Sequence, residues 1–433
     1  MGMTLTSDRR YSTLREEITN AMRERGVSPV SIAAQKNVSQ SDLSRMLGGS
    51  RTFSLEVLDA VTEALELPPG YFYHLFSGEC WGKGGKRLRK KTEEFVVRCY
   101  ELGLTDLVEE AMNELTAIPG NLDIIFAIAE SLFGKGHHDE ALRFYNKVIE
   151  KESNRMSPDL AVSFYRSFLI VRDHDLITAY EAAVKLTEYL KHLKGLMQTE
   201  AYLRVLAVFY AIEHWSGVEK YAKELAGIAV GMDVESYAGA LFYLGAVSEE
   251  KKDFKTALAL IDEYSKGVSD LYSSLAAVNR MTVEISAGNT ENIEALMAFI
   301  KQQPNRCRNL TTVIKSLVNF EKYEQIPAFL SDFDAEIRQL HSLNDPLSAK
   351  YIAYFRYYRS KYFFHVGMGG SAIEDLLYAI DLSARFKMPV VTIRCVTLLL
   401  KNITFATPAQ IDRCTFAMEE YERARKYDTI CIV

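Results

Sequence analysis

The chain has 433 residues and a mass of 49.0 kDa, more than one typical domain, so several domains or an extended repeat array are expected. Hydrophobic residues make up 48% and charged residues 25%, which excludes a disordered chain. The net charge is −6, and the charges are unevenly distributed along the chain. Residues 1–92 hold 14 Lys and Arg against 10 Asp and Glu, whereas the remaining residues hold 37 Lys and Arg against 47 Asp and Glu. The acidic bulk excludes general, charge-driven binding to nucleic acid.

Cysteine usage and hydropathy indicate an intracellular protein. The six cysteines are scattered without a CxxC pair in a chain too long to depend on disulfides, so we expect reduced thiols. No uncharged apolar run approaches the roughly 18–20 residues needed to cross a bilayer. The stretch MGMTLTSDRRY at the N-terminus lacks the apolar segment of a signal peptide. These features predict a cytoplasmic protein without a membrane partner.

Two helices are predicted in succession near the N-terminus. Residues 10–25 form an amphipathic pattern that Gly26 closes, with apolar side chains every four positions at Leu14, Ile18 and Met22. A second helix is expected over residues 29–36, because Ser28 is a good cap and Pro29 loses no hydrogen bond in a first turn.

The sequence after the second helix predicts a tight corner. Ala33 is small where two helices would cross, Asn37 can adopt the left-handed conformation, and Val38 fills the angle. Ser39 is expected to cap the following helix. Asp42, three residues later, completes an S-x-x-D box that favours a helix start. This pattern is typical of a helix-turn-helix.

The helix after the corner has one apolar and one polar face. The side chains expected to pack inward are Leu43, Met46 and Leu47. The polar face and the helix tip carry Gln40, Ser41, Ser44 and Arg45. An amide can form a bidentate pair with adenine, and an arginine suits guanine or phosphate. Such a helix fits the major groove of DNA with its N-terminal residues toward the bases.

Two further helical segments complete this region. The first is capped by Ser54, ends before Pro68 and carries Leu55, Leu58, Val61 and Leu65. The second would close a five-helix core with Tyr71, Phe72, Leu75 and Phe76. Residues 8–77 therefore resemble the Cro/C1 (XRE-type) helix-turn-helix domain. A five-helix domain that contacts other proteins is the alternative.

The resemblance implies a set of DNA-contacting residues in this domain. They are Lys36, Ser39, Gln40, Ser41, Ser44, Arg45 and Arg51. Lys36 occupies a position that is usually apolar, so we expect its stem to pack while its amine reaches solvent. Because residues 1–77 have a net charge of −1, affinity would depend on these few cations and on any help from the next segment.

A basic segment follows the helix-turn-helix region. Residues 78–91 are predicted to be a linker that contains KGGKRLRKK, with cations at Lys83, Lys86, Arg87, Arg89, Lys90 and Lys91. Such a cluster can contact phosphates. It can equally be a solvated linker, and the sequence leaves both interpretations open.

Apolar residues recur with a helical period throughout residues 92–433, and this region also contains a repeated pattern. Residues 124–150, 241–265 and 355–380 each place small residues where two helices approach closely, as in tetratricopeptide pairs. Looser copies cover 92–116, 161–190, 202–226 and 275–300. Since one such pair cannot bury its apolar face alone, we expect a continuous right-handed α-solenoid with a concave wall. An irregular helical bundle is the alternative. The predicted fold class is therefore all-α.

No catalytic, metal or cofactor site can be nominated. His137 and His138 lie in a predicted turn without carboxylates or cysteines at ligand spacing. GKGGK at 82–86 lacks both the spacing of a phosphate-binding loop and a preceding strand. We therefore expect a binding protein, not an enzyme, with no cofactor.

The first helix of each tetratricopeptide pair lines the concave wall, which selects a group of candidate binding residues. They are Tyr165, Arg166, Tyr202, Arg204, Tyr243, Asn279, Arg280, Tyr357 and Lys361. Asparagine can bind the backbone of an extended peptide, arginine can hold a terminal carboxylate, and tyrosines provide rigid walls. The same residue types also occur buried at helix crossings.

An XRE-type domain followed by tetratricopeptide-like repeats resembles the RRNPP family of peptide-pheromone receptors, which includes the phage arbitrium receptors. The resemblance covers nearly the whole chain and implies a homodimer that binds a double-stranded DNA operator under the control of a short signalling peptide in the groove. A regulator that senses a protein or metabolite, and an adaptor without DNA binding, are the alternatives. The C-terminal segment from residue 411 suits either an end cap or a dimer contact.

Overall fold

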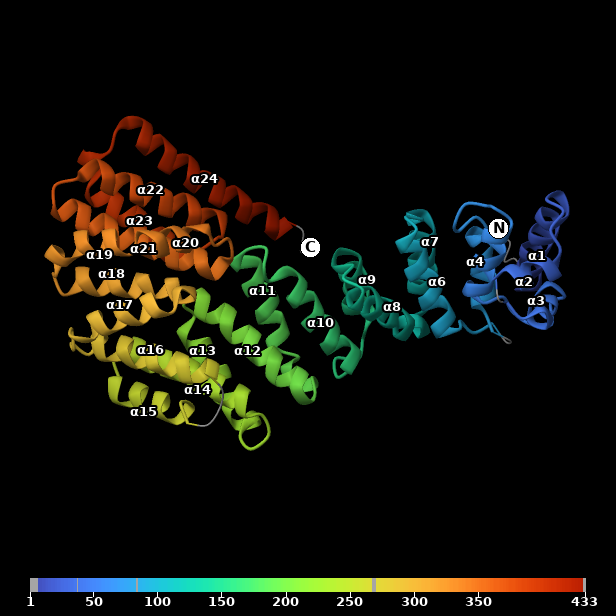
Figure 1. Cartoon of the computed structure of the whole chain (residues 1–433), viewed down its shortest axis with the longest axis horizontal. Coiled ribbons are helices and arrows are strands. Elements are labelled where there is room, and N and C mark those ends of the chain that lie inside the picture. The colour runs from blue at the N-terminus through green and yellow to red at the C-terminus, as the bar shows by residue number, and fades with distance from the viewer. Residues whose placement is uncertain (1–6, 37, 83–84, 267–269, 431–433) are drawn as a thin grey trace. The chain divides into compact units, whose positions relative to one another are not determined.

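The computed structural model describes residues 7–36, 38–82, 85–266 and 270–430 (Figure 1). Over this part of the chain the secondary structure is helical, apart from one antiparallel bridge between Trp81 and Arg87. The chain divides into two compact units, Met1–Ile170 and Val171–Val433. The predicted all-α class, a helix-turn-helix followed by tetratricopeptide-like helix pairs, is confirmed. We call these parts the N-terminal and C-terminal units.

The N-terminal unit begins with the predicted helices. They are α1 (Ser7–Glu24), α2 (Pro29–Lys36), α3 (Gln40–Leu47), α4 (Leu55–Ala64), α5 (Tyr73–Phe76) and the 3₁₀ turn η1 (Ser77–Cys80). Ser39 Oγ accepts a hydrogen bond of 3.3 Å from Asp42 N, and Ser54 Oγ accepts one of 3.3 Å from Val57 N. Both predicted caps are therefore present. Asn37, the predicted corner residue, lies outside the described residues.

The core of this region differs from the prediction at one aromatic position. Tyr71, expected inside, is 50% exposed, whereas Phe72 and Phe76 are buried. Tyr73 is fully buried instead, and its hydroxyl donates a hydrogen bond of 2.7 Å to Asp59. Gly70 adopts φ +77° in the turn before α5, and after this turn Tyr71 points to solvent while Phe72 and Tyr73 point inward.

Two helix pairs and the helix α10 follow. The helices are α6 (Arg89–Glu101), α7 (Thr105–Thr116), η2 (Pro119–Asn121), α8 (Leu122–Gly134), α9 (His138–Lys151) and α10 (Pro158–Val171). Gly136 adopts φ +82° between α8 and α9, as the repeat pattern requires. One apolar core extends without interruption from Leu14 to Val148. The helix-turn-helix region therefore shares its core with the first pairs.

The predicted linker is folded where the structure describes it. Leu88 N donates to Cys80 O at 2.8 Å, and Lys91 Nζ donates to Phe53 O at 2.5 Å. Arg87 is buried, pairs with Glu114, and its guanidinium lies 4.4 Å from the centre of the Trp81 ring. These two cations thus contact the protein itself. The exposed cations of the segment are Lys86, Arg89 and Lys90, and Lys83 lies outside the described residues.

The C-terminal unit continues the helix pairs. Its helices are α11 (Leu176–Thr187), η3 (Leu190–His192), α12 (Gly195–Ala211), α13 (Trp215–Ala229), α14 (Val234–Glu250), α15 (Phe254–Tyr264), α16 (Asp270–Ser286), α17 (Asn292–Gln302), η4 (Pro304–Asn309), α18 (Leu310–Asn319), η5 (Tyr323–Gln325), α19 (Ile326–Asp332), α20 (Asp334–Ser342), α21 (Pro346–His365), α22 (Gly369–Arg385), α23 (Pro389–Lys401), η6 (Ile403–Phe405) and α24 (Pro408–Ile430).

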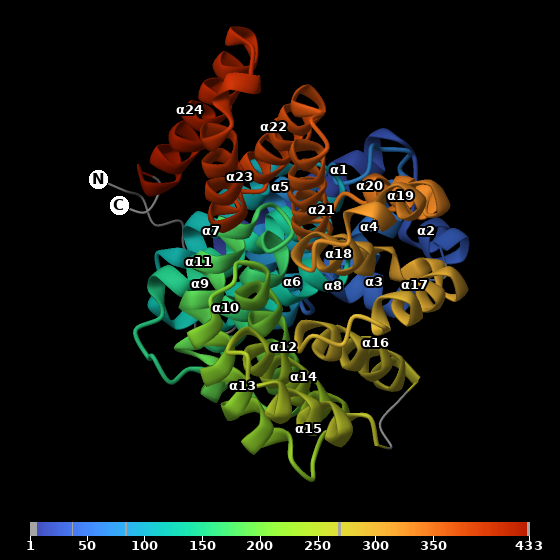
Figure 2. The ribbon, with the colours of Figure 1, turned by 90° about the vertical axis from the view of Figure 1, so that its left-hand side faces the viewer.

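The predicted repeats correspond to α14–α15 and α21–α22, and the looser copies to α12–α13 and α16–α17. Residues 304–342 do not form a regular pair of long helices but several short ones. Pro304 starts η4 and Pro327 lies in the first turn of α19, and a proline cannot lie in the interior of a long helix without breaking or kinking it. Figure 2 shows the helices of this unit following a curved path from α11 past α15 and α17 to α21 and α23.

The curved path brings the first helices of the C-terminal unit against α21 and the turn between α22 and α23. Leu176 N, at the start of α11, donates to Phe386 O at 3.1 Å, and the Lys387 ammonium lies 3.4 Å from Asp175. Lys350 Nζ on α21 donates to Tyr210 O on α12 at 3.0 Å, across 140 residues of sequence. The C-terminal unit therefore closes on itself through direct contacts of the α11 and α12 region with α21 and the turn before α23.

The beginning of α24 covers one end of this unit. Arg413 pairs with Asp381 on α22, and Cys414 and Ala417 are buried. The C-terminal segment thus serves as an end cap over these residues. Among the described residues, no helix combines the length and apolar character that crossing a membrane requires.

Candidate functional site

The outer face of α3 is the first candidate site. Gln40, Ser41, Ser44 and Arg45 are all exposed, while Leu43 and Met46 on the opposite face are buried. Arg45 makes no side-chain hydrogen bond or ion pair to any residue that the structure describes. The face therefore offers hydroxyls, an amide and a free guanidinium, the groups that can read base edges.

A buried ion pair holds α3 from behind. Arg15 Nε donates to Met46 O at 2.7 Å, which satisfies a carbonyl in the last turn of α3. The same guanidinium pairs with Glu79 at 2.8 Å and donates to Arg51 O at 3.0 Å. Glu79 also accepts from Phe53 N at 2.9 Å. Arg15, 8% exposed, and Glu79, 1% exposed, thus hold the end of α3 and the loop after it in place.

The two other predicted DNA-contacting cations have protein partners. Lys36 Nζ lies 2.6 Å from Glu63 on α4, so its amine reaches out as expected but meets a carboxylate. Arg51 pairs with Asp42 in the first turn of α3. Both pairs lie at the surface, with one partner of each only partly exposed, and surface pairs contribute little stability. Ser39 is occupied as the cap of α3, and its side chain remains exposed.

Two of the predicted concave-wall residues lie in the core. Tyr165 on α10 is 1% exposed, and Tyr202 on α12 is 0% exposed with its hydroxyl donating to Glu224 at 2.9 Å. Neither contributes to an accessible wall. Tyr202 faces α13, the partner helix of its pair, where a large ring fills the space between the two helices.

Four other predicted wall residues pair within the chain. Arg166 lies 3.1 Å from Glu130, Arg204 lies 3.3 Å from Glu200, and Arg280 pairs with Asp262. Asn279 Nδ2 donates to the Tyr264 hydroxyl at 2.8 Å. Arg280 and Asn279 therefore contact α15 of the preceding pair. Of these residues, Arg204 is the one that stays largely exposed.

Tyrosines from different helices of the C-terminal unit lie close to one another. The Tyr243 ring lies 5.9 Å from the Tyr210 ring, and both residues are half-buried. Burial raises the pKa of Tyr243 well above its ordinary value. Lys361 Nζ lies 4.9 Å from the centre of the Tyr357 ring, a cation–π arrangement. These three predicted residues, Tyr243, Tyr357 and Lys361, are thus partly accessible.

A carboxylate that the sequence did not single out organises the closure of this unit. Glu213, in the turn between α12 and α13, accepts a hydrogen bond of 2.7 Å from the Tyr354 hydroxyl. Lys350 Nζ lies 3.3 Å from Glu213 Oε1, and the guanidinium of Arg394 lies 3.7 Å from Oε2. We call these four residues the Glu213 cluster. Burial lowers the pKa of Lys350, and the Glu213 carboxylate opposes that shift.

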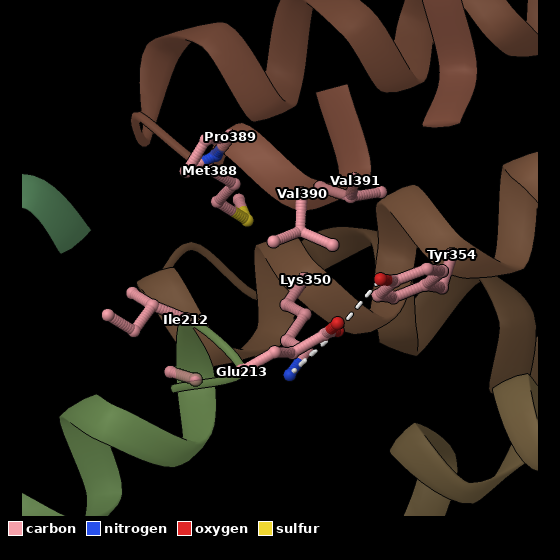
Figure 3. Close-up of a pocket in the computed structure, with 9 residues that line it drawn as sticks. Ile212, Glu213, Lys350, Tyr354, Met388, Pro389, Val390 and Val391 are labelled. Atoms are coloured by element: carbon pink, nitrogen blue, oxygen red, sulfur yellow. Dashed lines mark hydrogen bonds and ion pairs between the residues drawn. The ribbon is translucent and has the colours of Figure 1, made fainter. Parts of the chain in front are cut away.

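A small cavity of about 10 Å³, the space of roughly one water molecule, lies beside the Glu213 cluster (Figure 3). Its lining residues are Ala211, Ile212, Glu213, Lys350, Tyr354, Met388, Pro389, Val390 and Val391. Figure 3 shows Met388, Pro389 and Val390 on one side and Ile212 on the other, with the Glu213–Lys350 pair between them. The pocket is therefore apolar at its walls and charged at its base. No pattern in the sequence signals it.

Comparison with known proteins gives distant structural likenesses. No family model matches the chain, and no curated protein matches it. The structure of Bacillus thuringiensis PlcR with the peptide PapR7 and DNA is 12% identical with a TM-score of 0.27, over 73% of this chain and 98% of PlcR. A monomeric IFIT1 mutant with m7Gppp-AAAA is 13% identical with a TM-score of 0.37, over 98% of this chain and 96% of IFIT1. Such values assign no function.

Proposed function

We propose that this protein is a cytoplasmic, sequence-specific DNA-binding transcription regulator, not an enzyme, and that a short peptide bound to the C-terminal unit controls it. The observation that carries the DNA-binding part is the outer face of α3. Gln40, Ser44 and Arg45 project from a capped helix whose far end is held by the Arg15–Glu79 pair. A rigidly held helix loses little conformational entropy on docking into a major groove.

The proposal divides the contacts between bases and backbone. Gln40 and Arg45 supply base readout, because an amide and a guanidinium form bidentate pairs with adenine and guanine. Two cations near α3, the half-buried Lys36 and the exposed Arg51, contact phosphates once their ion pairs with Glu63 and Asp42 rearrange. Two copies of the chain would then bind half-sites about 34 Å apart on an operator with two-fold symmetry.

The peptide part of the proposal is supported by the construction of the C-terminal unit. Its helix pairs enclose half-buried tyrosines, Tyr210 and Tyr243, and a charged cluster at the closure. The C-terminal unit can have conformations that differ in curvature. A peptide that binds one conformation more tightly than another raises the fraction of molecules in that conformation, to the extent set by the ratio of its two affinities. Calorimetry with short synthetic peptides encoded beside the gene tests this part independently of DNA.

Selection from a pool of random duplexes of about 30 base pairs tests the DNA-binding part. The full-length chain is expected to enrich a defined sequence and to lose affinity steeply between about 50 and 200 mM salt. Arg45→Ala should weaken the free energy of binding to the selected duplex by about 1–3 kcal/mol, the value of one bidentate base contact. Arg25→Ala, an exposed arginine after α1, is the matched control and should retain it. Absence of any enriched sequence contradicts the proposal.

A further inference from the structure

The positive charge of the N-terminal unit is concentrated after the helix-turn-helix region, not within it. Residues 1–77 hold 8 Lys and Arg against 9 Asp and Glu, a net charge of −1. Residues 78–91 hold 6 Lys and Arg against one Glu, a net charge of +5. Proteins bind duplex DNA largely through cations that contact its phosphates. The helices around α3 therefore gain most of the charge that binding to a duplex needs from the segment that follows them.

Part of this segment, residues 85–91, is folded against the loop that follows α3, and we call it the basic turn. Gly82 N donates a hydrogen bond of 2.8 Å to Lys86 O, which fixes the start of the basic turn. Its end is fixed by Lys91, whose Nζ donates to Phe53 O at 2.5 Å. Phe53 lies two residues after Arg51, a stretch of chain at most about 7 Å long. The basic turn is therefore a close neighbour of the Arg51 loop.

Three cations of the basic turn point to solvent and are weakly paired. They are Lys86, Arg89 and Lys90. The side chains of Arg89 and Lys90 are 55% and 89% exposed. Arg89 lies 3.9 Å from Asp123, and Lys90 lies 3.9 Å from Glu94, whereas charge-assisted hydrogen bonds measure about 2.7–2.9 Å. Lys86 forms no ion pair with any residue that the structure describes. All three cations can therefore accept a new anionic partner.

We propose that the basic turn contacts the phosphate backbone of duplex DNA beside the major groove that α3 reads, through Lys86, Arg89 and Lys90. The inference rests on the proposed function, which brings α3 to DNA. The basic turn reaches the same duplex because one apolar core, from Leu14 to Val148, holds it and α3 in a single unit. The contact adds affinity without sequence preference, since phosphates are the same at every base pair.

This contact has a consequence for the coupling between DNA and the helix repeats. The first helix of the repeats, α6, begins at Arg89, inside the basic turn. Buried residues of α6, Phe95 and Val96 among them, belong to the same core as α8 and α9. A phosphate held by the first turn of α6 thus ties the repeats to the operator directly. A rearrangement that moves α6 changes this contact without acting through α3.

Fluorescence anisotropy of the selected duplex with the full-length chain, at several salt concentrations, tests the proposal. The double variant Lys86→Gln, Lys90→Gln should lower the slope of log affinity against log salt by about 2, since each phosphate contact contributes about 0.9. Its affinity at 0.1 M salt should fall by about tenfold or more. The sequence that it enriches in the duplex selection described above should be that of the wild type.

The control is a second double variant of equal charge. Lys135→Gln, Lys151→Gln removes two exposed cations from the α8–α9 pair and should keep the wild-type slope. Thermal unfolding verifies that each variant folds. If the Lys86, Lys90 variant unfolds, Lys90→Gln alone serves as the test, because this side chain is 89% exposed. It should lower the slope by about 0.9.

A wild-type slope in the Lys86, Lys90 variant overturns the proposal. An equal loss of slope in the control variant also overturns it, because it reveals a general effect of net charge. A changed enriched sequence does the same, because it places these lysines on bases. In all three cases the wild-type chain still enriches a sequence, so the DNA-binding proposal stands. A wild-type chain that enriches no sequence rejects the proposed function, and the basic turn contact with it.

Discussion

Arg15 and Glu79 form a buried ion pair that joins the last turn of α3 to the segment leading into the helix repeats. The Arg15 guanidinium satisfies Met46 O, and the Glu79 carboxylate satisfies Phe53 N, so the pair has few unmet hydrogen-bonding groups. A buried charge left without its partner is costly. The orientation of the α3 face therefore depends on a residue from outside the five predicted helices.

Glu79→Gln should lower the free energy of unfolding by about 3–5 kcal/mol, because it leaves the Arg15 charge buried without a counter-charge. Urea denaturation of the full-length chain measures the change, and hydrogen exchange should show lost protection at the end of α3. Glu56→Gln, at an exposed position on α4, is the control and should change stability by less than about 0.5 kcal/mol. Equal stability of the two variants would show that the pair does not hold this region.

Gly70→Ala should destabilise the protein more than Gly26→Ala. Both glycines adopt positive φ, +77° and +65°, so both substitutions carry the left-handed strain of a side chain. A methyl group at Gly70 would also lie 2.8 Å from Leu104 Cδ1, whereas nothing lies within 4 Å of one at Gly26. We expect an additional loss of about 1–3 kcal/mol at Gly70, measured by denaturant unfolding. If the Gly26→Ala variant were less stable than the Gly70→Ala variant, the steric clash inferred between a methyl group at position 70 and Leu104 would be disproved.

Stability should fall as the pH drops below 6.5, in part through His341. Its Nδ1–H donates to Ile337 O at 2.7 Å, and its Nε2 accepts from Arg356 Nε at 2.9 Å, so the ring is neutral in this arrangement. Burial lowers the pKa of His341 from its ordinary value of 6.5, and the nearby Arg356 and Arg359 add to this effect.

The sign of the His341 contribution follows from proton binding in the two states. Below pH 6.5 His341 binds a proton in the unfolded chain but stays neutral in the folded chain, because its pKa in the folded chain is lower. Its contribution to stability is therefore fully present above pH 6.5 and is lost as the pH falls toward the lowered pKa. His341→Gln should flatten the dependence of the unfolding midpoint on pH. His74→Gln, at an exposed position, should leave it unchanged. A variant at position 341 with the wild-type pH profile would reject this assignment.

The buried thiols should react slowly in the native protein. Burial raises the pKa values of Cys80, Cys99 and Cys395 to about 12. At pH 8 the thiolate fraction is then smaller than in the unfolded chain by a factor on the order of 10³. Alkylation with iodoacetamide, resolved by mass spectrometry of peptides, should modify these cysteines rapidly only in denaturant. Comparable rates in native buffer would contradict their burial.

Local signals predicted the helix-turn-helix region well. The caps at Ser39 and Ser54, the start of α2 at Pro29 and the outward face with Arg45 all depend on residues within four positions of each other, so the sequence contains the information. The helix repeats were predictable for the same reason, because their small residues recur at helical spacing. Asn37 remains a prediction, as it lies outside the described residues.

Long-range pairs could not be predicted in this way. Glu79 and Arg15 are 64 positions apart, and Glu213 and Tyr354 are 141 apart, so each appears in the sequence as an isolated charged or polar residue. Tyr165 and Tyr202 illustrate a second limit. A step of one residue turns a helical side chain by about 100°, so choosing the correct helix does not decide between the open wall and the core.

The sequence preference of the α3 face tests the central claim most directly. Duplex selection is performed in parallel with the wild-type chain and with Gln40→Ala, and the enriched sequences are compared. We predict that the wild type enriches one sequence with two-fold symmetry and that Gln40→Ala relaxes the preference at one position in each half-site, with an unchanged salt dependence of affinity. Identical enriched sequences from both proteins, or none from either, would contradict DNA reading by α3.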